Sequence, residues 1–135
     1  MAQEILVKEP LEEKKIEAGK ELLNRLAKTD FNVTAALWLW STERPYWDLV
    51  IASPWIKKNG LSKAYRKIDD IFFGAPRPIS EFEFTSIYAM DTAKPLIKAL
   101  RNFAKQKKAD LSGRRLKDYW LDDVSVDDAY VYFVK

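Results

Sequence analysis

Apolar and polar residues alternate between Ala35 and Ser53 in a way that predicts a β-hairpin. The first half reads Ala-Ala-Leu-Trp-Leu-Trp-Ser, and the second half reads Tyr-Trp-Asp-Leu-Val-Ile-Ala-Ser. A five-residue loop from Ser41 to Pro45 would pair Trp40 with Tyr46. In that register the core face carries Leu37, Leu39, Trp47, Leu49 and Ile51, and the opposite face carries Trp38, Trp40 and Tyr46.

Three other segments have apolar residues at helical spacing and predict helices. The first begins near residue 10 and ends between Lys28 and Asp30, the second covers residues 61–72, and the third follows Asp91 or Thr92. Gly19 falls within the apolar stripe of the first helix. Because a glycine inside a helix costs about 1 kcal/mol relative to alanine, it predicts a close approach of the helix backbone to the sheet.

Further strands are predicted after the second and third helices. Residues 80–90 alternate, with Phe82, Phe84 and Tyr88 on one side, and residues 114–134 keep a period of two that gives one or two strands. Leu116 and Trp120 share a side in this pattern. No β-α-β unit repeats. We therefore expect an α+β fold, with a mainly antiparallel sheet of four to five strands and three helices in the order α-β-β-α-β-α-β-β.

The chain length and composition fit one domain. The 135 residues are 47% hydrophobic and 32% charged, as in folded globular proteins. We expect residues 1–9 to form a short N-terminal tail and residues 10–135 to form the domain. The sequence has neither a signal-peptide pattern nor a membrane-span pattern, so we expect a cytoplasmic protein without a membrane partner.

The chain has no cysteine and no histidine. This excludes thiolate nucleophiles, histidine general bases and the commonest zinc ligands within the chain. Four glycines form no phosphate-binding loop, and no cofactor or small-molecule ligand is implied. The remaining enzyme hypothesis is a histidine-free, metal-dependent nuclease or phosphotransferase whose carboxylates come from Asp48, Glu81, Glu83 or Asp91.

The second hairpin face is the first candidate binding surface. Large rings that the core does not need are typical of protein interfaces, so Trp38, Trp40 and Tyr46 predict a contact with a protein partner, most simply a second copy in a homodimer. The alternative is that a helix or the C-terminal strands cover this face and make it ordinary core. Our main functional hypothesis is a non-catalytic interaction or regulatory module.

A basic stripe on the third helix is the second candidate surface. Its residues recur at steps of three and four, so they align along one helix face: Lys94, Lys98, Arg101, Lys105 and Lys108. Such a stripe can bind phosphates, which gives the alternative hypothesis of a nucleic-acid-binding module. A solvated, lysine-rich helix face is the other interpretation. A stripe next to exposed rings would resemble a surface for single strands, in which cations hold the backbone and rings stack on bases.

Aspartates cluster towards the C-terminus, at Asp118, Asp122, Asp123, Asp127 and Asp128. Carboxylates in a group can bind magnesium or calcium, but this spacing does not match an EF-hand loop. Aspartate also favours turns, because its side chain accepts hydrogen bonds from nearby backbone amides. We interpret the cluster as turn residues and assign no metal site.

Overall fold

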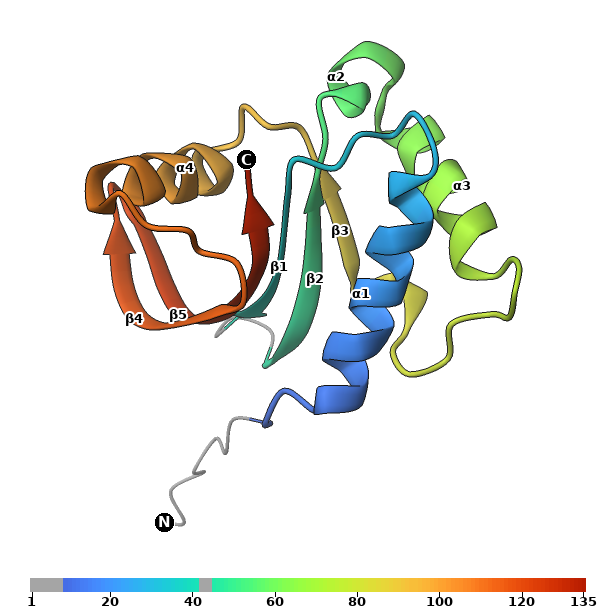
Figure 1. Cartoon of the computed structure of the whole chain (residues 1–135), viewed down its shortest axis with the longest axis horizontal. Helices are drawn as coiled ribbons and strands as arrows, with labels where there is room; N and C mark the ends of the chain where they lie inside the picture. The colour runs from blue at the N-terminus through green and yellow to red at the C-terminus, as the bar shows by residue number, and fades with distance from the viewer. Residues whose placement is uncertain (1–8, 42–44) are drawn as a thin grey trace, which may run out of the picture.

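The computed structural model describes residues 9–41 and 45–135, and within them five strands form one sheet. The strand order is β3-β2-β1-β5-β4 (Figure 1). Their bounds are Ala35–Ser41 for β1, Tyr46–Ala52 for β2, Ile87–Met90 for β3, Arg114–Leu121 for β4 and Val124–Val134 for β5. Neighbours are antiparallel except β2 and β3, which are parallel. The predicted α+β fold and element order are confirmed, with a sheet that is mixed rather than purely antiparallel.

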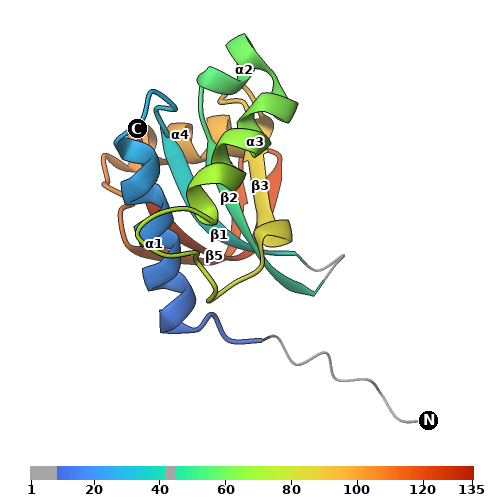
Figure 2. The ribbon, with the colours of Figure 1, turned by 90° about the vertical axis from the view of Figure 1, so that its right-hand side faces the viewer.

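Helices cover both faces of the sheet (Figures 1 and 2). The long helices are α1 (Glu13–Ala27), α3 (Leu61–Phe72) and α4 (Pro95–Lys107). Leu22 of α1 and Ile68 of α3 share one hydrophobic cluster with Trp38 and Leu49, whereas Ile97 of α4 lies in a second cluster on the other face. The central strands β1 and β2 are therefore buried on both faces. No helix in the described parts of the chain has the length and apolar character of a membrane span.

The hairpin register differs by one residue from the predicted one. Trp40 pairs with Trp47 instead of Tyr46, and Ser41 pairs with Tyr46. Residues 42–44 of the predicted loop lie outside the described residues. A shift of one residue moves every side chain of one strand to the other face. Consequently Trp47, Leu49 and Ile51 share a face with Trp38 and Trp40, and the predicted partners Leu37 and Leu39 lie on the α4 side.

The segment between α3 and α4 is less extended than predicted. Its strand covers only Ile87–Met90, because a 3-10 turn, η1 (Phe84–Ser86), precedes it. Phe82 and Phe84 pack on Phe72 on the α3 side, whereas Tyr88 packs in the cluster on the α4 side, so these rings do not share one face. A short helix, α2 (Trp55–Asn59), lies between β2 and α3.

The predicted side-chain pattern of β4 is wrong at Trp120. Asp118 has a left-handed backbone conformation, with φ of 58°, and the alternation of buried and exposed positions changes there. Leu116 and Leu121 are buried, whereas Trp120 is 73% exposed. A left-handed residue also interrupts the outer edge of the sheet, which hinders the addition of another strand.

Gly19 of α1 lies against the sheet, as predicted. A Cβ atom at this position would overlap with the hydroxyl of Tyr132 and would lie 3.2 Å from Nε1 of Trp38. The Tyr132 hydroxyl accepts a hydrogen bond from Nε1 of Trp38 (2.7 Å) and donates one to the Ile16 carbonyl (2.6 Å). Burial raises the pKa of Tyr132. This hydroxyl therefore joins β1, β5 and α1, and only glycine lets the helix approach it.

Candidate nucleic-acid interface

The aromatic hairpin face is covered by helices, which agrees with its interpretation as ordinary core. Trp38 is 1% exposed and Trp40 is 7% exposed. The ring of Trp38 packs edge-on against Phe82, and Trp40 packs edge-on against Trp47. The shifted register places these rings under α1 and α3, while Tyr46 is half-buried at the end of β2. A partner could reach Trp38 or Trp40 only if the helices moved away. Self-association itself stays a prediction without this surface to support it.

The C-terminal aspartates are distributed over separate contacts. Asp128 is fully buried, and both of its carboxylate oxygens accept hydrogen bonds from Arg115, at 2.6 and 2.9 Å. This pairing raises the pKa of Arg115, whose guanidinium also lies 5.2 Å from the centre of the Trp47 ring. Asp122 accepts a hydrogen bond from Asn102 of α4. In the portion of the chain that the structure describes, no three Asp or Glu side chains form a group that could hold a metal ion.

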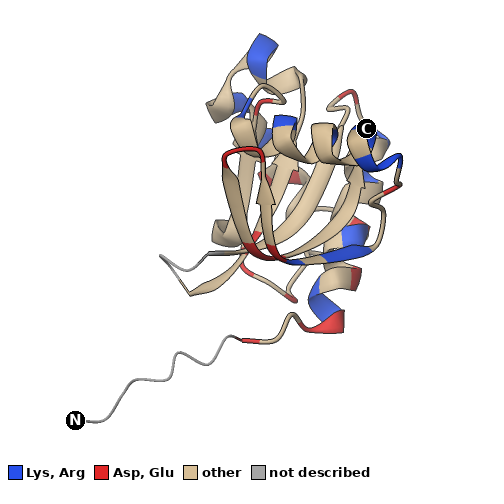
Figure 3. Ribbon diagram, turned by 90° about the vertical axis from the view of Figure 1, so that its left-hand side faces the viewer, with Lys and Arg blue, Asp and Glu red and all other residues tan. Residues whose placement is uncertain are grey.

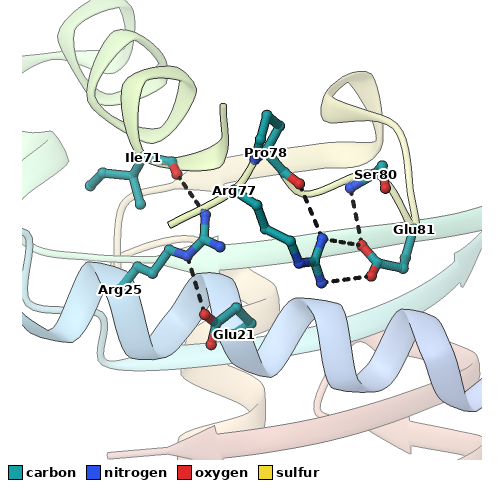
Figure 4. Close-up of polar contacts among 7 residues, drawn as sticks. All are labelled: Glu21, Arg25, Ile71, Arg77, Pro78, Ser80 and Glu81. Carbon is teal, nitrogen blue, oxygen red and sulfur yellow. Dashed lines mark hydrogen bonds and ion pairs between the residues drawn. The ribbon is translucent and has the colours of Figure 1, made fainter. Parts of the chain in front are cut away.

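The carboxylates of the nuclease hypothesis lie on different elements. Asp48 is buried on β2, Glu83 is exposed before η1, and Asp91 follows β3. Glu81 accepts hydrogen bonds from the Arg77 guanidinium, the shorter at 3.0 Å, and from the Ser80 amide (Figure 4). These bonds lower the pKa of Glu81 from 4.5 to about 2. Glu81 is therefore part of a local ion pair that fixes the loop.

The Arg77–Glu81 pair predicts a contribution to acid stability. Because the pKa of Glu81 is lower in the folded than in the unfolded chain, the contribution is complete above about pH 4.5 and disappears as the pH falls through about 2. Glu81→Gln should therefore lose stability relative to the wild type at neutral pH but not near pH 2, as measured by urea unfolding across this range. Arg77→Met should behave in the same way. Unfolding curves that keep a constant separation at every pH would contradict the assignment.

A second polar cluster joins α1 to α3. Arg25 is 8% exposed, and it donates hydrogen bonds to Glu21 (3.4 Å) and to the Ile71 carbonyl (3.2 Å) at the end of α3 (Figure 4). It borders a hollow of about 400 Å³ that Lys28 and Asp70 also line. Two basic and two acidic side chains balance each other there, and the ends of two helices present carbonyl groups. The cluster is therefore suited to holding helices together rather than to binding an anion.

The basic stripe of α4 is present as a surface feature. Lys94, Lys98, Lys105 and Lys108 are exposed, and none of these four has an ion-pair partner among the described residues. Arg101 is half-buried, and its Nε donates a hydrogen bond to the Lys135 carbonyl (3.3 Å). The helix contains no acidic residue. Steps of three and four residues place successive cations about 5 Å apart along the axis, so the stripe is a linear array of charge.

Positive charge is concentrated in the C-terminal third of the chain. Residues 94–135 contain ten Lys and Arg against six Asp and Glu, whereas residues 1–93 contain 13 against 14. Basic segments are spread along α4 and the first part of β4, and acidic segments lie at the β4–β5 turn (Figure 3). The net charge of +3 therefore understates the local potential near α4.

An aromatic groove runs between α1 and β5. A hollow of about 310 Å³ is lined by side chains of both elements, among them Lys20, Asn24, Tyr130, Tyr132 and Phe133. It shares Asn24 and Phe133 with a neighbouring hollow of about 260 Å³ that extends to Asn32 and Lys135. We call the two hollows together the α1–β5 groove. The larger hollow is at the lower end of the range of small-molecule sites, and rings with a few polar groups are a typical lining.

The groove lies on the α1 face of the sheet and the α4 stripe on the opposite face, and Lys135 at the end of β5 contacts both. Arg101 of the stripe donates its hydrogen bond to the carbonyl of Lys135, and Lys135 lines the groove. Lys135 also places its ammonium 5.2 Å from the centre of the Phe133 ring. The structure thus brings cations and rings together, although the rings are not those predicted from the sequence.

The sequence pattern did not predict this groove. Tyr130, Tyr132 and Phe133 lie in β5, where an uninterrupted period of two would place Phe133 on the face opposite Tyr130 and Tyr132. A bulge between the β1 pairs Ala36–Phe133 and Leu37–Val131 changes that period. The useful signal was the spacing of Tyr130 and Tyr132, since residues two apart share a face of a strand.

Comparison with protein-family models, curated proteins and solved structures finds no significant match for this chain.

Proposed function

We propose that this protein is a nucleic-acid-binding module that contacts phosphates through the α4 stripe. The observation that carries the proposal is the row of four exposed lysines without ion-pair partners in the described chain. Lys98 and Lys105 lie within α4, Lys94 and Lys108 cap its two ends, and the helix has no acidic residue. Lysine ammonium groups bind phosphate as point charges, and a linear array of them suits a linear polyanion. The proposal assigns no catalytic step.

The aromatic hairpin supports the alternative interaction module less well. Its rings stabilise the core, because they pack beneath α1 and α3 and Trp38 donates its indole N–H to Tyr132. Among the described residues the large exposed rings are Phe73, Tyr119 and Trp120. Trp120 precedes the acidic turn at Asp122, and its strand is interrupted by the left-handed Asp118. These features favour a functional surface at α4 over one at the sheet edge.

Salt dependence tests the proposal. If four lysines contact phosphates, log K for a single-stranded oligonucleotide should fall linearly with log salt, with a slope of about −3. Fluorescence anisotropy with a labelled oligothymidylate, measured from low to physiological ionic strength, gives this slope. Binding that does not change with salt, or no binding at low salt, would contradict the proposal.

Polyglutamate distinguishes nucleic acid from an acidic protein partner. It presents carboxylates instead of phosphates, so it should displace the oligonucleotide only at a much higher concentration of charged groups. Equal displacement at matched charge would show that the stripe attracts polyanions in general, and the assignment to nucleic acid would then fail.

A further inference from the structure

We propose that the α1–β5 groove accepts unpaired bases, so that the protein selects single-stranded over double-stranded nucleic acid. This inference rests on the proposed function, because the α4 stripe must hold the phosphates of the same strand. It adds the class of nucleic acid and a second contact surface.

The groove offers rings in an arrangement that a base can use. The ring centres of Tyr130 and Tyr132 are 5.3 Å apart, and the two rings pack edge to face. Tyr130 and Phe133 are half-buried, and part of each residue is accessible from the groove. Tyr132 is fixed by hydrogen bonds to Trp38 and Ile16. Every base has an aromatic face, so rings held in place bind single strands with little sequence preference. Paired bases in a duplex keep their faces stacked on each other and cannot enter.

Polar groups at the groove also suit the binding of a nucleotide. Asn24 and Asn32 are exposed at its lining and carry amide groups that can donate to and accept from base edges. Lys20 and Lys135 supply positive charge along the groove, against one acid, Glu17. A ligand with apolar faces, polar edges and negative charge agrees with all three features, whereas a purely apolar ligand would leave the amides and lysines unused.

Continuity with the stripe makes one strand the natural occupant. The hydrogen bond from Arg101 to the Lys135 carbonyl fixes the end of β5 beside α4. A strand whose phosphates follow Lys105, Arg101 and Lys98 would reach Phe133 by passing around the end of β5 beside Lys135. The backbone of one molecule would then be bound on the α4 face of the sheet and its bases on the α1 face.

Removal of one ring tests the groove. Tyr130→Leu keeps an apolar side chain but removes the stacking face, and we expect it to weaken binding of oligothymidylate roughly 5- to 100-fold while duplex affinity changes less than about twofold. Tyr130→Phe keeps the ring and should bind within about twofold of the wild type. Trp120→Ala is the matched control, since it removes a more exposed ring outside the groove. Circular dichroism establishes that each variant is folded.

Photochemical crosslinking gives a second readout that does not depend on any variant. An oligonucleotide containing 5-iodouracil should crosslink to Tyr130 or Phe133 of the wild-type protein, as identified by mass spectrometry of the tryptic peptides. A crosslink at Trp120 instead, or loss of affinity in Trp120→Ala but not in Tyr130→Leu, would overturn the inference.

The outcomes separate this inference from the proposed function. Equal affinity for single strands and duplexes, with Tyr130→Leu unchanged, would refute the groove but leave the α4 stripe as a phosphate-binding surface. Absence of binding to both forms at low salt would refute the proposed function, and the groove assignment with it.

Discussion

Reversal of two charges in the α4 stripe should weaken nucleic-acid binding by about 2 to 3 kcal/mol, roughly 30- to 160-fold at low salt. The variant is Lys98→Glu combined with Lys105→Glu. Each substitution removes an attraction and adds a repulsion close to the phosphates, and each such charge change is worth about 1 kcal/mol or less in water. Both side chains are exposed, so stability should change by no more than about 0.5 kcal/mol.

A control variant separates the local stripe from the total charge of the protein. Lys57→Glu with Lys63→Glu makes the same change of net charge on α2 and α3, where both lysines are exposed. Fluorescence anisotropy should show only a small loss of affinity for this control, through the weaker long-range field. If both pairs of substitutions reduce the affinity equally, binding depends on net charge and not on the α4 surface.

Gly19→Ala should lower the free energy of unfolding by about 2 kcal/mol, which corresponds to roughly 5 to 10 °C in Tm. The added methyl group would overlap with the Tyr132 hydroxyl, which cannot move without losing its hydrogen bonds to Trp38 and Ile16. Alanine favours a helix over glycine by about 1 kcal/mol, and this gain offsets part of the cost. Urea unfolding followed by circular dichroism measures the difference.

A double-mutant cycle identifies the cause. Once Tyr132→Phe has removed the hydroxyl, Gly19→Ala should cost at least about 1 kcal/mol less than in the wild type. Glu17→Ala, at an exposed position of the same helix, should change stability by less than about 0.5 kcal/mol. Additive effects of Gly19→Ala and Tyr132→Phe would mean that the close approach of α1 to Tyr132 does not limit the residue at position 19.

The sequence allowed good prediction of those helices and strands that have one buried face and one face exposed to solvent. The long helices alternate apolar and charged residues, so their periodicity carried the information. The start of the third helix was predicted too early, because Lys94 rather than Asp91 or Thr92 caps α4. The register of the hairpin was predicted wrongly, because its pattern lacks this contrast between a buried and an exposed face. Both of its faces are buried in the middle of the sheet, so apolar residues occupy almost every position and alternation does not reveal which face is which.

The candidate site could be predicted only in part. The cations of α4 were evident from spacing within one helix, because neighbours at three and four residues share a face whatever the tertiary structure. The rings could not be assigned, since the exposure of Trp38 or Tyr130 depends on where α1 packs, and a bulge in β5 and the left-handed Asp118 in β4 change the alternation locally. The groove and the stripe lie on opposite faces of the sheet, and they are connected through the contact of Arg101 with Lys135, which are distant in sequence.

Nuclear magnetic resonance tests the central claim most directly, because it locates the binding surface on the folded protein without any substitution. Titration of an isotopically labelled sample with a short oligothymidylate at low salt should shift the amide signals of residues 94–108 and 130–135 together, with smaller changes on the outer side of α3. Shifts concentrated on residues 57–73, or an unchanged spectrum at saturating oligonucleotide, would contradict the assignment of nucleic-acid binding to the α4 stripe.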